Sequence, residues 1–297
     1  MAPTNWADRA DQLLQRSSTL ESDLYRSSNA GIIRKAVCGI GLDSDRKHLS
    51  GGVRIVFNIS SAHARKILSR RYRNGYELEE KDVRVGGKPP AAVSNRRRRI
   101  DNMVATLGSS TAKGETLYYG ALELNGAGMR YYGDLCLVLR EAALGPSTLL
   151  LYRNSYDLDR EPIRSRVNGV EAKLRLEARA LAGHGSDAAD MVICKILTDA
   201  APTTRLMTTG LISEGVLADE DYLEVPLEQS FGAAELCEIR TASGDVAAEA
   251  RIGSRLEQGP PPTLAELLWR NRRRDAERCA SDLDLPIRIV SSQGRTR

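Results

Sequence analysis

The stretch 221–228, with the sequence DYLEVPLE, decides how the rest of the chain is interpreted. Successive side chains of a β-strand project to opposite faces, so the alternating Leu, Val and Leu of this stretch are expected on a core face. Glu224 then lies on the opposite face, where its carboxylate can point into a cleft. The competing interpretation is a solvated charge on an edge strand. Pro226 favours that alternative because proline cannot donate a ladder hydrogen bond.

Turn signals and hydrophobic periods elsewhere predict an α+β fold. Strands are predicted at residues 53–59, 117–124, 134–140, 148–154, 222–228 and 236–239. Helices are predicted from the Ser60-Ser61 cap to about residue 72, from Ser94-Asn95 onward, over 163–200, and over 263–278, where Thr263 and Glu266 form a capping box.

Changes in composition suggest how the chain is divided. Residues 1–50 are Ser-rich with few apolar positions, so we predict a weakly ordered leader or helical region there. One large domain is predicted over 51–297. Within it, residues 163–210 interrupt the strands just before the Glu224 strand. This helical segment is interpreted as an insertion that recognises a substrate, since insertions on a rigid core often carry specificity.

Composition excludes several classes. The 297 residues are 41% hydrophobic and 28% charged with a net charge of +4, which is typical of a globular protein. The five cysteines have no zinc-ligand spacing, so no metal is expected, and their number favours a reducing compartment. We recognise neither a membrane span nor a cleavable signal peptide and therefore expect no membrane partner and no classical secretory route.

Tyrosines and arginines are unevenly distributed. The chain has ten Tyr but only two Phe and two Trp, which hints at surfaces that stack on or hydrogen-bond a ligand. Four arginines follow one another at 96–99. This run is interpreted as a solvated helix face or a partner-binding surface rather than a phosphate clamp.

The order of short motifs supplies a family resemblance. A strand at 54–59 is followed by Tyr-Tyr-Gly-Ala-Leu at 118–122, by a Tyr-Tyr-Gly-Asp start at 131–134, by Asn-Ser-Tyr-Asp at 154–157, and finally by the strand of Glu224. Over roughly residues 51–240 this order resembles the ADP-ribosyltransferase fold, most closely the CteC-like bacterial effector group with PARP-like features. The resemblance implies a split β-sheet core that binds NAD in a cleft, with the domain 51–297 as the catalytic unit.

The resemblance also implies catalytic residues. Cleavage of the nicotinamide–ribose bond places positive charge on the sugar, which a fixed carboxylate can stabilise. Glu224 is the first candidate for this role and Glu220 the reserve. A second carboxylate can accept the proton of the attacking hydroxyl, and Asp134 and Asp157 are the two positions that the chain offers.

Six residues are expected to contact NAD by the same resemblance: Arg54, Asn58, Tyr119, Gly120, Asn154 and Ser155. Asn58 departs from the family, which carries a His or Arg anchor near this place. Tyr119 and Gly120 likewise stand where a Ser-Thr-Ser triplet is expected. Each position also has a packing or turn interpretation. Tyr119 can simply pack, Asp134 follows a turn glycine, and Asn154 can end a strand with an Asx turn.

These considerations favour an enzyme that transfers ADP-ribose from NAD to a host protein. The resemblance implies a threonine of ubiquitin as the acceptor, and a monomeric effector toxin delivered to the host cytoplasm by an injection system. A nucleic-acid-binding protein is the first alternative because of the arginine clusters, but no recognition motif accompanies them, so no nucleic acid is expected. A non-catalytic adaptor of the same fold is the second alternative.

Overall fold

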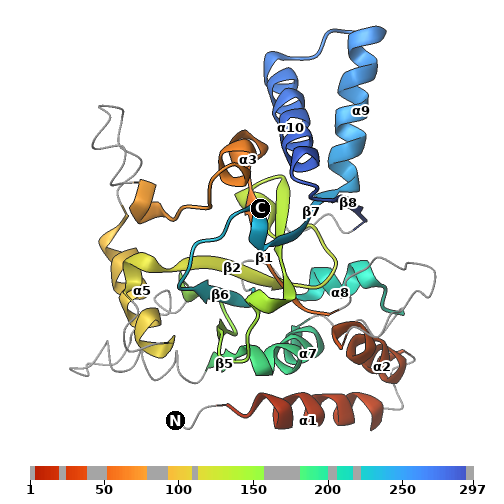
Figure 1. Cartoon of the computed structure of the whole chain (residues 1–297). Coiled ribbons are helices and arrows are strands. Elements are labelled where there is room, and N and C mark those ends of the chain that lie inside the picture. Colours follow the sequence, from red (N-terminus) through yellow and green to blue (C-terminus); the bar gives the residue numbers. More distant parts are fainter. Residues whose placement is uncertain are drawn as a thin grey trace.

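The computed structural model describes residues 4–19, 25–38, 52–78, 93–108, 113–156, 181–199, 206–216 and 222–291. These parts are organised around one eight-stranded sheet with helices on both sides (Figure 1). The molecule therefore has the predicted α+β fold class.

The sheet places β6 in its interior. Its strands are β1 (Arg54–Ile59), β2 (Tyr118–Glu123), β3 (Leu135–Leu139), β4 (Leu149–Leu151), β5 (Ala182–His184), β6 (Glu224–Leu227), β7 (Leu236–Ala242) and β8 (Ile287–Val290). Their spatial order is β5-β4-β6-β2-β1-β3-β7-β8, and neighbours are antiparallel except for the parallel pair β7 and β8. All predicted strands are present, whereas β5 and β8 lie where no strand was predicted.

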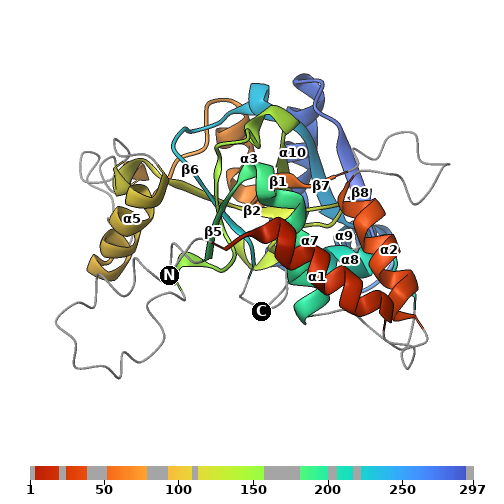
Figure 2. The same cartoon turned by 90° about the horizontal axis from the view of Figure 1, so that it is seen from below.

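Helices cover both faces of the sheet. They are α1 (Trp6–Thr19), α2 (Arg26–Val37), α3 (Ser61–Leu68), α5 (Asn95–Gly108), α7 (Ala188–Asp199), α8 (Thr209–Val216), α9 (Ser243–Glu257) and α10 (Leu264–Asp282). Helices α1, α2, α7 and α8 form one layer (Figure 2), and α3 and α10 pack against each other. Helices α9 and α10 form a hairpin that projects from the sheet (Figure 1). Helix α9 was not predicted.

Sequence caps fix two helix starts as predicted. The Ser60 hydroxyl accepts a hydrogen bond from the Ala62 amide at the start of α3. Thr263 and Glu266 form the predicted capping box of α10, with the Glu266 carboxylate accepting from the Thr263 amide at 2.7 Å. Helix α3 ends at Leu68, earlier than predicted. Among the described helices, none has the length and apolar character needed to cross a membrane.

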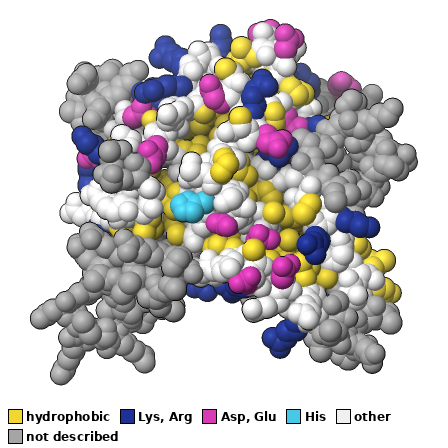
Figure 3. Space-filling view, turned by 60° about the horizontal axis from the view of Figure 1, so that its bottom comes forward, with side chains coloured by type: hydrophobic (Ala, Val, Ile, Leu, Met, Phe, Trp, Pro, Cys, Tyr) yellow, Lys and Arg dark blue, Asp and Glu magenta, His cyan; other side chains and the backbone are white. Residues whose placement is uncertain are grey.

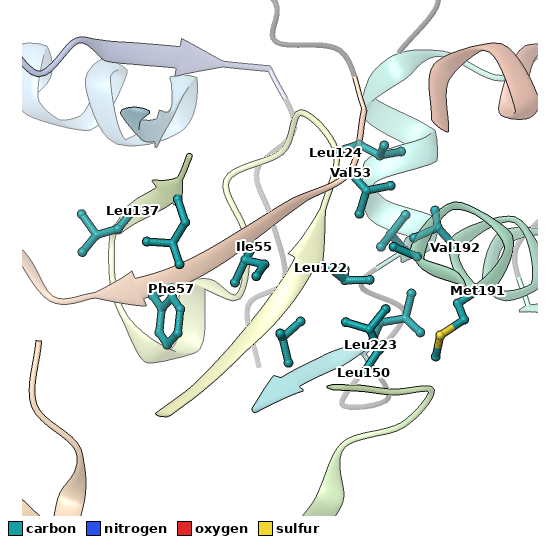
Figure 4. Close-up of a cluster of buried hydrophobic side chains, with 14 of the residues drawn as sticks. Val53, Ile55, Phe57, Leu122, Leu124, Leu137, Leu150, Met191, Val192 and Leu223 are labelled. Carbon is teal, nitrogen blue, oxygen red and sulfur yellow. The ribbon is translucent and has the colours of Figure 1, made fainter. Parts of the chain in front are cut away.

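The hydrophobic core joins one face of the sheet to α1 and α7 and also includes buried side chains of α3 and α10. Figure 4 shows Ile55, Leu122 and Leu223 projecting from neighbouring strands toward Met191 and Val192 of α7. Cross-strand pairing of Ile55 with Leu122 puts both on one face. Leu223 and Val225 are fully buried, so the predicted core face of the 221–228 stretch is confirmed.

Of the two alternatives for residues 1–50, a weakly ordered leader or a helical region, the described residues form the helices α1 and α2. Trp6 is buried, its ring stacks on Tyr152 with centroids 4.7 Å apart, and its Nε1 donates to the Ala182 carbonyl at 3.0 Å. Helix α1 packs along α7 and α2. Residues 39–50 lie outside the described part of the chain. Tyr152 and Ala182, which are far from Trp6 in the sequence, provide the contacts that stabilise this region. The local composition of residues 1–50 does not indicate such contacts.

The segment 163–210 contributes to the core where the structure describes it. Strand β5 pairs with β4 at the sheet edge. Helix α7 is buried along most of its length, including Met191, Ile193 and Ile196. Residues 157–180 and 200–205 lie outside the described ranges. Replacing the whole segment by a linker would therefore remove core structure together with any recognition element.

Candidate active site

The face of the sheet opposite the α1/α7 core carries the candidate site. Val56 of β1, Ala121 of β2 and Glu224 of β6 lie directly across from one another in the two antiparallel ladders. Residues paired in this way share a face. Glu224 therefore lies on the face predicted from the 221–228 alternation. Its strand β6 is separated from β1 by β2 alone.

A cleft of about 540 Å³ lies over this face. Strands β1 and β2, the segment 72–76, helix α5 and the segments around 131 and 154 enclose it. Its most unusual feature is the number of tyrosines that line it: Tyr72, Tyr76, Tyr118, Tyr119, Tyr131, Tyr132, Tyr156 and Tyr222. Eight of the ten tyrosines in the chain thus meet at one place. Phenol rings offer flat faces for stacking and hydroxyls for hydrogen bonding.

Glu224 is one of two buried carboxylates among the described residues that line the cleft, the other being Asp101. The Glu224 side chain is almost fully buried, and its Oε2 accepts a hydrogen bond from the Ser155 amide at 2.8 Å. Burial raises the pKa of Glu224, while the nearby charge of Arg97 and the hydrogen bonds from Ser155 act in the opposite direction. The alternative of a solvated edge-strand charge is wrong, because β6 is an interior strand and Tyr and Arg side chains from other elements cover the carboxylate.

Arg97 and Asp101 form an ion pair one helical turn apart on α5. Arg97 Nε lies 2.7 Å from Asp101 Oδ1, and the two carboxylate oxygens also accept from the hydroxyls of Tyr119 and Tyr76, each at 2.7 Å. Asp101 is buried, whereas the Arg97 side chain retains 21% exposure in the cleft. The site therefore contains a fixed cation that reaches its open space.

Burial raises the pKa of Tyr119 well above its usual value, so this tyrosine stays a neutral donor to Asp101. Burial alone would lower the pKa of Arg97. The neighbouring Tyr119, Glu224 and Asp101 outweigh that effect and raise it. Arg97 is consequently charged at every accessible pH.

The arginine run 96–99 was interpreted as a solvated helix face or a partner-binding surface, but three of its four side chains are half-buried against tyrosines. The guanidinium of Arg96 lies 4.7 Å from the ring centroid of Tyr156, and that of Arg97 lies 3.9 Å from the ring of Tyr119. Arg98 covers Tyr76 at 5.1 Å. Three successive arginines thus hold tyrosines that line the cleft through cation–π contacts. Sequence reasoning missed Arg97 and Asp101, although their i,i+4 spacing of opposite charges was a usable signal.

Two further tyrosines form the rim. The short 3₁₀ helix η2 (Arg130–Tyr132) brings the Tyr131 and Tyr132 rings to a centroid distance of 4.2 Å. The Tyr132 hydroxyl lies 3.4 Å from that of Tyr222, while its side chain is 55% exposed. Tyr132 therefore connects the open edge of the cleft to the strand that carries Glu224.

Asn58 lines the cleft, but its amide is used to shape the wall. Its Nδ2 donates to the carbonyls of Ala127 and Gly133, and its Oδ1 accepts from the Met129 amide at 2.7 Å. The loop can wrap around Asn58 because Gly128 has a φ of +68°, and a Cβ there would lie 2.2 Å from Asn58 Oδ1. In this structure the amide orients a loop.

Three other residues that were predicted to contact NAD lie at or beside the cleft, each with a different structural role. Gly120 lines it, and a side chain at this position would collide with the Phe57 ring at 2.7 Å. Asn154 also lines it, and its side-chain oxygen accepts from the Tyr156 amide at 2.9 Å, which is the Asx turn of the alternative interpretation. Ser155 contributes its amide to Glu224.

Arg54 and Asp134 have structural partners outside the residues that line the cleft. Arg54 donates to the Val53 carbonyl and forms an ion pair with Glu141 at 3.1 Å. Asp134 accepts from the Ser61 amide at the start of α3, and its other oxygen accepts from the Trp269 indole at 3.0 Å and from Arg273. Asp134 thus connects β3 to α3 and α10.

Glu220 and Asp157, the remaining catalytic candidates, lie outside the described residues. Within the part of the chain that the structure describes, no group of three or more His, Cys, Asp or Glu side chains could hold a metal ion.

Comparison of the chain with protein-family models, with curated proteins and with solved structures found no match.

Proposed function

We propose that this protein transfers ADP-ribose from NAD to a protein acceptor, with Glu224 as its catalytic carboxylate. The observation that carries the proposal is a buried carboxylate that faces a tyrosine-lined cleft and is held by the Ser155 amide. The motif segments of the family resemblance also come together here. Tyr119, Gly120, Asn154 and Tyr131 all line the cleft with Glu224.

The residues of the cleft suit NAD as a ligand. A volume of about 540 Å³ falls in the usual range of small-molecule sites. The nicotinamide ring of NAD is a cation, and tyrosine faces attract cations through their quadrupole. Arg97 supplies a permanent positive charge in the same cleft that can pair with a phosphate. The aromatic faces, the Arg97 cation and the Glu224 carboxylate thus complement the three parts of the ligand.

The proposed chemistry is a substitution at the ribose carbon. The bond from that carbon to the nicotinamide nitrogen breaks, and its electron pair neutralises the pyridinium charge. The acceptor oxygen forms the new bond, and its proton passes to a base. Positive charge develops on the sugar meanwhile, and a preorganised carboxylate stabilises such charge. Glu224 must be ionised for this role, which the neighbouring Arg97 and the Ser155 amide promote against the effect of burial.

Asp134 takes no catalytic part in this proposal, because its oxygens already bind Ser61, Trp269 and Arg273. Asp157 remains the candidate for the base. A threonine of ubiquitin as the acceptor and delivery of a bacterial effector into the host cytoplasm are finer parts of the proposal, and they rest on the family resemblance alone.

The test is release of nicotinamide from NAD and transfer of labelled ADP-ribose to proteins of a cell lysate. Glu224→Gln keeps an oxygen for the Ser155 amide but removes the charge, so both rates should fall by about 10² or more. Glu228→Gln is the matched control, since this exposed residue ends the same segment. It should retain the wild-type rates.

Three results separate the alternatives. Equal loss in both variants would remove Glu224 from the mechanism. NAD binding by calorimetry without nicotinamide release by the wild type would favour the non-catalytic adaptor. No binding and no release would refute the proposal as a whole.

A further inference from the structure

A strongly basic hollow lies on the segment that forms one wall of the cleft. Its volume is about 410 Å³, and its lining consists of Lys66 near the end of α3 and of Arg70, Arg71 and Arg73 just after that helix. Arg71 and Arg73 flank Tyr72, which lines the tyrosine cleft. The hollow and the cleft thus share one short segment of chain.

Helix structure explains only part of this charge. A cation in the last turn of a helix complements the negative end of the dipole, which accounts for Lys66. The three arginines follow the helix, so the helix dipole does not account for their positions. Arg71 pairs with Glu77 at 2.5 Å. For Lys66, Arg70 and Arg73 the structure records no acidic partner among the described residues.

The segment that bears these cations is held rigidly. The Tyr72 amide donates to the Phe231 carbonyl at 2.7 Å, and its ring stacks on Phe231 with centroids 5.0 Å apart. The Asn74 side chain donates to the carbonyls of Glu115 and Leu117. A backbone that is fixed before a ligand arrives loses less entropy when the side chains that it bears bind that ligand. By contrast, the side that carries α1 and α7 shows acidic and basic side chains mixed together (Figure 3).

We propose that this basic hollow, formed by Lys66, Arg70, Arg71 and Arg73, binds a carboxylate-rich segment of the protein acceptor and so presents that acceptor to the cleft. Guanidinium groups pair with carboxylates through two parallel hydrogen bonds. Single-stranded nucleic acid usually requires aromatic stacking faces beside the cations, and none is among the described residues that line this hollow. The inference rests on the proposed function for the nature of the acceptor, but binding to the hollow is measured independently.

The experiment compares two variants with the same change in net charge. Lys66→Glu with Arg70→Glu alters two exposed residues of the hollow, and Arg251→Glu with Arg272→Glu alters two exposed residues of the α9–α10 hairpin. Binding of a fluorescein-labelled peptide of glutamates is followed by anisotropy at low and moderate salt. The hollow variant should lose about tenfold or more in affinity, and the hairpin variant should match the wild type.

Equal weakening in both variants, or none in the hollow variant, would overturn the proposal. Tighter binding of an oligothymidine than of the glutamate peptide would assign the hollow to nucleic acid instead. Thermal unfolding checks that the variants fold. If the charge reversal unfolds the chain, Lys66→Gln with Arg70→Gln replaces it.

Turnover separates this inference from the function on which it rests. The hollow variant should release nicotinamide at the wild-type rate but label lysate proteins about tenfold less. If the wild type releases no nicotinamide, the proposed function fails while the peptide measurement still decides whether the hollow binds carboxylates.

Discussion

Two clusters of buried charge lie on the same face of the sheet. One is open to the cleft, and the other is closed off by protein. In the cleft, Arg97 and Asp101 stand beside Glu224, and the Arg97 side chain reaches open space. Farther along the sheet, Arg240 of β7 binds Glu238 at 2.6 Å and the Leu124 carbonyl at 2.7 Å. Arg240 is 1% exposed, so its donors are directed at fixed protein partners.

The difference separates structural charge from charge available to a ligand. Arg288 and Glu123 complete the Arg240 cluster, with Arg288 Nε 3.0 Å from Glu238 and Glu123 fully buried. Tight packing closes this cluster, since a Cβ on Gly126 would lie 2.8 Å from the Glu123 carboxylate. Burial and shifted pKa values occur in both clusters, so they do not by themselves identify a site. What distinguishes the cleft cluster is that its charged groups face a cavity.

The largest effect is expected from Arg240→Met. The substitution leaves Glu238 with only Arg288 and removes the positive charge beside Glu123. Loss of one partner from a buried ionic cluster costs about 3–5 kcal/mol of unfolding free energy. Urea unfolding measures this, with Arg251→Met on the exposed side of α9 as the control. A loss below about 1 kcal/mol would mean that the cluster contributes no more to stability than an exposed ion pair does.

The second effect concerns pH. Burial raises the pKa of Glu123 to about 7 from the usual 4.5 of a glutamate. Between these values the folded chain holds a proton that the unfolded chain has released, so stability falls as pH rises through this window. The decrease amounts to about 3 kcal/mol at most.

Urea unfolding at about pH 5 and about pH 8 measures this decrease. Glu123→Gln should flatten the dependence. A smaller slope should remain, because the raised pKa of Glu224 acts in the same direction. An unchanged slope in the variant would assign the proton to another group.

Arg97→Met should cost less stability than Arg240→Met, about 2 kcal/mol, because the tyrosine hydroxyls still bind Asp101. Its diagnostic effect is on the pH profile. Arg97 lowers the pKa of Glu224, so the variant should need a higher pH for nicotinamide release. Arg97→Lys should restore part of the shift. A variant with a lower rate but an unshifted profile would limit Arg97 to a structural role.

The smallest effect is expected from Tyr119→Phe. It removes the hydrogen bond to Asp101 but keeps the ring beneath the Arg97 guanidinium. A loss of about 1 kcal/mol is expected in thermal or urea unfolding. Tyr132→Phe at the exposed rim is the comparison and should change stability by less than about 0.5 kcal/mol. Similar losses in both would show that the hydroxyl–Asp101 contact contributes little.

Local sequence patterns predicted the elements of the sheet but not the environment of its side chains. The alternation in 221–228 assigned Leu223 and Glu224 to opposite faces correctly, because strand geometry is local. It left open whether Glu224 points into a cleft or into solvent, since the residues that bury it come from α5 and from the segment around Ser155. Asp134 was likewise offered as a base, although its neighbours Trp269 and Arg273 come more than a hundred residues later.

The candidate site was predicted only in part for the same reason. The acidic strand and the Tyr-Gly segment of β2 were found from the sequence. Arg97 and Asp101 were missed because a run of arginines is usually solvated, and only the fold shows that Tyr119, Tyr76 and Tyr156 face it. The excess of Tyr in the composition drew attention to these residues, but composition does not show that eight of them line one cleft.

The position of Trp6 has a consequence for the synthesis of the chain. Its indole binds the carbonyl of Ala182, which is 176 residues later, and the Cys194 thiol reaches the Trp6 carbonyl across 188 residues. Helix α1 can pack on α2 soon after both are made, but the ribosome must add the 176 residues that separate Trp6 from Ala182 before Trp6 can dock there. Contacts of such long sequence separation slow folding. Helix α1 thus docks on α7 late, and until then the apolar side chains that it places against α7 are available to chaperones.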